Sequence, residues 1–145
     1  MPEKDPVRDY LESYWELRKE HERLERKVEE LESQCQSVTA KLNAVPGGGG
    51  GRSNDTWDAL VEARDRASQQ LTETLYREAE IEQFINSLSE PRHRQLLKHR
   101  YLELLDWEPI ADLLHYTVRH AHRIHGEALE AARALWNKEQ EEKDD

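Results

Sequence analysis

The feature that most constrains this chain is the spacing of apolar residues between Val7 and Leu42. They recur at alternating steps of three and four, at positions Val7, Tyr10, Tyr14, Leu17, His21, Leu24, Val28, Leu31, Cys35, Val38 and Leu42. His21 is the one member that is neither apolar nor cysteine. This spacing keeps a single stripe on one face of a slightly under-wound helix, as coiled-coil packing requires. Because neither Gly nor Pro interrupts it, we predict one long helix.

A glycine run then ends the helical pattern. Residues 47–51 are five consecutive glycines, preceded by Pro46. Such a run loses too much backbone entropy to favour a helix. No strand pattern precedes it and no Gly-Lys-Ser/Thr follows, which argues against a phosphate-binding loop. We predict a flexible loop over residues 46–55.

A second helical stripe follows the loop and contains more polar residues than the first. Its positions are Trp57, Leu60, Arg64, Ala67, Leu71, Thr74, Glu78, Ile81, Ile85 and Leu88, widened by Val61, Leu75 and Phe84. Two helices of similar length joined by a short loop favour an antiparallel pair, because neither stripe can bury itself alone. We therefore predict a long antiparallel coiled-coil hairpin from residues 1–45 and 56–88. The same stripes could also pair with a second copy, giving a homodimer.

Composition limits the classes of protein to consider. Charged residues make up 36% of the 145 residues, apolar residues another 36%, and the net charge is −10. No long apolar run predicts a membrane span, and residues 1–5 do not resemble a secretory signal. A lone cysteine, Cys35, suits a reducing compartment. We expect a cytoplasmic protein. Residues 1–90 carry a net charge of −8, but residues 91–125 carry +2.

The part of the chain after residue 88 predicts a bundle of three shorter helices. Pro91 breaks the second long helix and suits the first turn of the next one. The expected helices run from Arg92 to about Leu104, from Trp107 to Leu114, and from a cap at Thr117 to about Leu135. A short helix, a tight turn and a longer capped helix form a helix-turn-helix. The predicted fold is thus all-α, with this bundle over residues 89–136 and a disordered acidic tail over residues 137–145.

The last predicted helix leaves one face available for a ligand. His115 falls at the turn, where a left-handed backbone is expected, and Ile110, Leu114, Ala121 and Ile124 form the expected small core. The outward residues near the start of the helix are Thr117, Val118, Arg119, His122 and Arg123. Arginine can donate two hydrogen bonds to guanine in the major groove, and valine can contact a thymine methyl. These residues are our candidate DNA-binding site.

Three segments carry a resemblance to a known family: Arg92–Tyr101, Leu105–Thr117 and Arg123–Leu129. Together they resemble region 4 of sigma-70-type factors, and more closely the small phage-encoded sigma-like regulators near the ArpU and RinA group. The resemblance implies a phage protein that binds promoter DNA and contacts RNA polymerase in the cytoplasm of a bacterial host. It also implies that Arg94, Lys98 and Arg100 approach phosphates. The family's usual turn glycine is His115 here.

The sequence also allows functions other than promoter binding. The acidic coiled coil could itself be the active surface of an interaction protein, such as a phage inhibitor or a DNA mimic. A small terminase-like packaging subunit is a further alternative. The sequence predicts no enzyme, since Cys35 lies on a packing stripe and no catalytic spacing is evident.

Six of the seven histidines lie between residues 93 and 125. His122 and His125 share a face, but no cysteine is near and the spacing does not suggest a zinc site, so we expect neither metal nor cofactor. Imidazoles gain charge near pH 6.5, so we expect DNA affinity to rise as pH falls from about 8 to 6.

Overall fold

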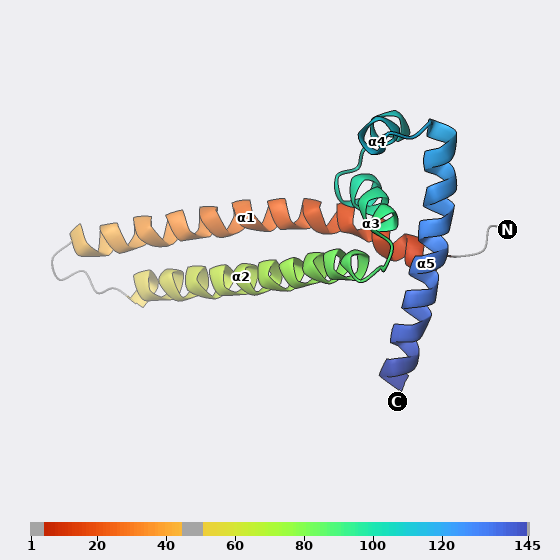
Figure 1. Cartoon of the computed structure of the whole chain (residues 1–145). Coiled ribbons are helices and arrows are strands. Elements are labelled where there is room, and N and C mark those ends of the chain that lie inside the picture. Colours follow the sequence, from red (N-terminus) through yellow and green to blue (C-terminus); the bar gives the residue numbers. More distant parts are fainter. Residues whose placement is uncertain (1–4, 45–50, 145) are drawn as a thin grey trace. The chain divides into compact units, whose positions relative to one another are not determined.

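The computed structural model describes residues 5–44 and 51–144, and these form helices and connecting turns with no strand among them (Figure 1). The chain is therefore all-α, as predicted. In order, the elements are α1 (Pro6–Ala44), α2 (Gly51–Asn86), α3 (Pro91–Leu97), a π-helical turn η1 (Lys98–Leu102), α4 (Trp107–Leu114) and α5 (Val118–Asp144). The chain divides into two compact units, residues 17–76 and residues 1–16 with 77–145.

Two predicted boundaries differ from the structure. Within the loop expected over 46–55, residues 46–50 lie outside the described part, whereas residues 51–55 already belong to α2. Adding a residue to an existing helix costs little, and Ser, Asn and Asp suit a first turn. Likewise α5 continues to Asp144, where a disordered tail from residue 137 was expected. The tail sequence is rich in Glu, Lys and Gln, which favour helix, and contains neither Gly nor Pro.

The unit of residues 17–76 is built from the later part of α1 and the earlier part of α2. Its buried residues are Leu24, Cys35, Ala67 and Thr74, all members of the predicted stripes. Leu75, expected to widen the second stripe, is 43% exposed. Residues from both helices, including Cys35 and Trp57, line one hollow of about 650 Å³. Cys35 of the first predicted stripe and Trp57 and Arg64 of the second therefore line the same hollow.

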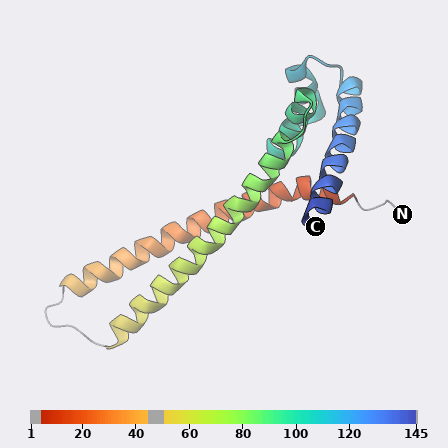
Figure 2. The ribbon, with the colours of Figure 1, turned by 60° about the horizontal axis from the view of Figure 1, so that its bottom comes forward.

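In the other unit, α3 and α4 pack against α5, and Figures 1 and 2 both show α5 running beside α3. Its interior is formed by Leu96 and Leu97 of α3, Ile110 and Ala111 of α4, and Ala121, Ile124, Ala128, Leu129 and Ala132 of α5. Ile110 of α4 and Ala121 and Ile124 of α5 belong to the small core that the sequence predicted. Small alanines on α5 let the shorter helices approach its backbone closely.

The first turns of α1 and the last turns of α2 complete this unit. The rings of Tyr10, Phe84 and Trp136 form a cluster, with centroids 5.0 to 6.0 Å apart. Leu11, which is outside the predicted stripe, is fully buried because α1 is covered here on more than one side. Trp15 of α1, in contrast, is 45% exposed.

Candidate nucleic-acid interface

The turn between α4 and α5 depends on a left-handed residue. His115 has φ 59° and ψ 43°, and its N–H donates to the carbonyls of Ala111 and Asp112. The N–H of Tyr116 also donates to Ala111 O, at 2.8 Å. These bonds satisfy carbonyls that the end of a helix otherwise leaves without partners. The structure thereby confirms the predicted conformation of His115.

Thr117 starts α5 in the predicted way. Its Oγ1 accepts a hydrogen bond from the N–H of His120 at 3.0 Å, which is the bond of an N-terminal capping residue. The cap sets the direction in which α5 leaves the turn. It therefore also sets the direction of the side chains in the first two turns of α5.

Those turns expose the remaining predicted residues. Val118 is 38% exposed, and Arg119, His122 and Arg123 are exposed as well. Arg123 Nη2 donates to Nδ1 of His120 at 2.7 Å. Within residues 5–44 and 51–144, no ion pair involves Arg119 or Arg123. The start of α5 thus presents two guanidinium groups without carboxylate partners.

The three residues expected at phosphates lie in different surroundings. Arg94 is half-buried, and its Nη1 donates to the carbonyls of Leu88 and Ser89 just beyond the end of α2. Arg100 is half-buried too, and its Nη1 donates to Leu105 O at 3.0 Å. Lys98 is half-buried, and no ion pair in the described part of the chain involves it. Two of the three side chains therefore already bind backbone carbonyls.

A group of rings lies behind the exposed face. Trp107 has its ring centroid 4.0 Å from that of His122 and 4.9 Å from that of His125. His125 Nε2 forms a 2.8 Å hydrogen bond with the hydroxyl of Tyr101. Burial, together with the positive charges of Arg8 and Arg100, lowers the pKa of His125 to about 4. His125 is therefore a neutral packing residue at neutral pH.

Sequence reasoning missed this group of rings. The spacing of His122 and His125 placed them on one face of the last helix, but it could not show that the ring of Trp107 packs on both imidazoles.

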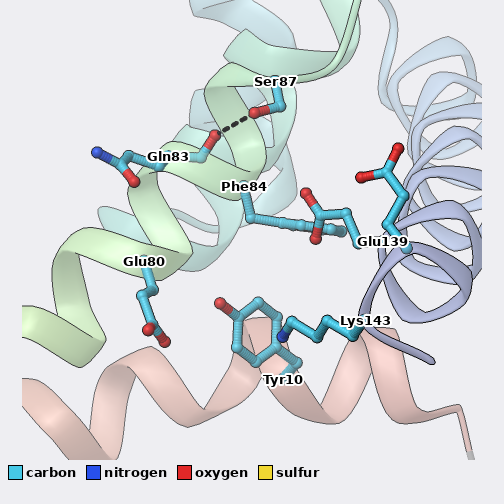
Figure 3. A pocket seen from close by; sticks show the side chains of 8 residues that line it. Tyr10, Glu80, Gln83, Phe84, Ser87, Glu139 and Lys143 are labelled. Atoms are coloured by element: carbon cyan, nitrogen blue, oxygen red, sulfur yellow. Dashed lines mark hydrogen bonds between the residues drawn. The ribbon is translucent and has the colours of Figure 1, made fainter. Parts of the chain in front are cut away.

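A second surface feature of this unit is acidic. A hollow of about 410 Å³ is lined by residues of α1, α2 and α5: Tyr10, Glu80, Gln83, Phe84, Ser87, Glu139, Glu142 and Lys143 (Figure 3). Burial, together with the negative charges of Glu80 and Glu139, raises the pKa of Tyr10 to about 12. Three carboxylates against one ammonium make this hollow unfavourable for phosphate groups, unlike the start of α5.

Comparison with known proteins places the chain in a family. Residues 34–131, more than half of the chain, match the family described as Protein of unknown function (DUF1492). The chain belongs to this family. No curated protein and no solved structure matches it. Among the described residues, no helix is long and apolar enough to cross a membrane.

Proposed function

We propose that this DUF1492 protein binds double-stranded DNA through α4, the turn and α5, acting as a helix-turn-helix. The observation that carries the proposal is the exposed start of α5, where Arg119 and Arg123 project without carboxylate partners beyond a tightly bonded left-handed turn. In helix-turn-helix proteins the second helix enters the major groove with its N-terminal residues at the bases.

The chemistry of the exposed side chains suits base recognition. A guanidinium can donate to both O6 and N7 of guanine, and the methyl groups of Val118 can contact a thymine methyl. The Thr117 side chain already accepts a bond from the backbone, so its hydroxyl hydrogen remains available for a phosphate oxygen. Exposed acids on α4, Glu108 and Asp112, oppose phosphate contact from that helix. We therefore assign the main contacts to α5.

The biological setting follows from the resemblance to sigma-70 region 4. We propose a phage or prophage transcription regulator that acts at a promoter. In this account α1 and α2 form an antiparallel coiled-coil hairpin, which either pairs with a second copy or contacts RNA polymerase. The net charge of −8 over residues 1–90 keeps this part of the chain away from DNA.

The test is a titration of labelled duplexes by fluorescence anisotropy over a range of salt concentrations. The duplexes are a random-sequence pool and fragments flanking the protein's own coding sequence. With about five phosphate contacts, the slope of log K against log salt should be near −4 to −5. The double variant R119A/R123A should bind at least about tenfold more weakly, because each guanidinium contact discriminates by roughly 1–3 kcal/mol.

The matched control removes two positive charges elsewhere. Arg26 and Arg66 are exposed in the unit of residues 17–76, and R26A/R66A should leave DNA binding unchanged. Equal losses in both double variants would mean that net charge alone decides binding, and would contradict recognition by α5.

A second function is favoured by one specific observation, the high negative charge of residues 1–90. An acidic helical surface could bind a basic partner, as a DNA mimic or phage inhibitor does, and a packaging subunit is the further alternative. Repeating the titration with RNA polymerase separates these functions. Binding to polymerase with no binding to any duplex would favour the interaction protein over the DNA-binding regulator.

A further inference from the structure

The connection between η1 and α4 contains a second left-handed residue, Leu104, with φ 59°. A leucine in this conformation is unusual, because its Cβ crowds the backbone. Two hydrogen bonds join residues that precede Leu104 to Leu105, which follows it. The N–H of Leu105 donates to His99 O at 2.9 Å, and the carbonyl of Leu105 accepts from Arg100 Nη1 at 3.0 Å. The Arg100 guanidinium thus closes the turn that leads into α4.

The same guanidinium lies over an aromatic ring. Its Cζ is 4.9 Å from the ring centroid of Trp107, the first residue of α4. This distance is within the range of a cation–π interaction, and tryptophan is the most favourable ring for it. Arg100 therefore contacts both the Leu105 carbonyl, which precedes α4, and the Trp107 ring, which lies at the start of α4.

Trp107 connects Arg100 to α5. Its ring packs on His122, with centroids 4.0 Å apart, and on His125, at 4.9 Å. His122 is one residue from Arg123 and three from Arg119. Arg100, Trp107 and His122 thus form a continuous series of contacts from η1 through α4 to the exposed face of α5.

We infer that Arg100 is a positioning residue that sets the placement of α4 and of the exposed face of α5, and that it is not a phosphate ligand. The inference rests on the proposed DNA-binding function for its functional consequence. It differs from the phosphate contact that the family resemblance implies for Arg100. The geometry needs arginine, because a planar fork can stack on the indole while one N–H reaches the carbonyl. A lysine has the charge but not this fork.

The test compares R100A, R100K and R119A in the salt-dependent DNA titration described above. A positioning role predicts that R100A and R100K both bind about tenfold more weakly, with the salt slope of the wild type. A phosphate contact contributes about 0.9 to the slope, whereas R119A, which removes a proposed base contact, is the reference for a loss of affinity without the loss of a phosphate contact. If R100K binds like the wild type, or if R100A reduces the slope by about 0.9, Arg100 contacts phosphate and the inference is wrong.

A measurement without DNA separates this inference from the proposed function. The imidazole Cε1–H resonances of His122 and His125 report the position of the Trp107 ring, and both should shift in R100K. Circular dichroism establishes that the variant remains folded. R66K, a change at an exposed arginine of the other unit, is the control and should shift neither resonance. Unmoved resonances in a folded R100K would overturn the positioning role, even if the wild type binds no DNA.

Discussion

Arg133 Nη2 lies 2.7 Å from Oδ2 of Asp5, which joins two residues separated by 128 positions in the chain. The other carboxylate oxygen of Asp5 accepts from the N–H groups of Val7 and Arg8, at 3.2 and 3.3 Å. One side chain therefore caps α1 and also connects its start to α5. The hydrogen bond from Arg133 is the largest cause that lowers the pKa of Asp5.

Substitutions at Asp5 should separate its two roles. D5A removes the cap and the ion pair, and we expect it to reduce the unfolding free energy by about 1–2 kcal/mol. D5N keeps a capping oxygen and loses the charge, so its cost should be below about 1 kcal/mol, as for other exposed ion pairs. Urea denaturation at pH 7 measures both values. Equal costs for D5A and D5N would mean that the cap contributes nothing.

The stabilisation from Asp5 should also depend on pH. Its pKa in the folded state is depressed, so its contribution is complete above the unfolded pKa of about 3.9. It is lost as pH falls through the folded value. The stability difference between wild type and D5N should therefore shrink in acid.

His115 offers a test of the left-handed turn. Glycine adopts φ near 59° without steric cost, so H115G should raise the unfolding free energy by up to about 1 kcal/mol. Valine is β-branched and poorly accommodated there, so H115V should lower it by more than that. Thermal unfolding followed by circular dichroism gives the order of stability of the wild type, H115G and H115V. A less stable H115G would show that the imidazole makes a contact worth more than the strain.

The neutral His125 should make stability fall in mild acid. Its folded pKa of about 4 is below the ordinary value near 6.5, so the unfolded chain binds the proton first as pH falls. The contribution of neutral His125 to the unfolding free energy is complete above about pH 6.5, and it is lost progressively as the pH falls from about 6.5 to about 4. Comparison with H125Q, which does not titrate, separates this loss from that of the carboxylates. Parallel pH profiles for the two proteins would contradict the assignment.

Trp136 should be an important packing residue although it is only half-buried. Its ring contacts Tyr10 and Phe84, which come from α1 and α2. W136A should cost about 3 kcal/mol, the lower end of the range for truncating a buried aromatic residue. W15A is the matched control, because Trp15 is 45% exposed, and its cost should be below about 1 kcal/mol. Similar costs for the two variants would argue against the ring cluster as part of the core.

The expected rise of DNA affinity from pH 8 to pH 6 now depends on fewer histidines. His125 remains neutral over this range because its pKa is about 4. The rise therefore does not come from His125, and H122Q, which removes the imidazole from the exposed face of α5, should flatten the pH profile of DNA binding measured at constant salt. A profile that is flat in the wild type would remove the histidines from the binding surface.

The sequence alone determined the features that depend on neighbours within one or two helical turns. The apolar spacing predicted the helices, and a polar residue at a sharp turn predicted the left-handed His115. A hydroxyl at the start of a helix predicted the Thr117 cap. The exposed face of Arg119, His122 and Arg123 followed from helical spacing in the same way. These are local properties, because the backbone and nearby side chains decide them.

Tertiary structure decided which of the candidate side chains remain available. The family resemblance implied phosphate contacts for Arg94 and Arg100, but both donate to carbonyls of the non-helical connections, Leu88 and Ser89 before α3 and Leu105 before α4, whose path helical spacing does not give. The packing of Trp107 on α5 and the bond between Asp5 and Arg133 join segments that no spacing rule relates. The prediction of a disordered tail from residue 137 was wrong, because Glu, Lys and Gln favour helix and residues 137–144 extend a helix that already exists. Contacts between distant segments depend on where the chain folds back, and that position is settled by the whole packed unit.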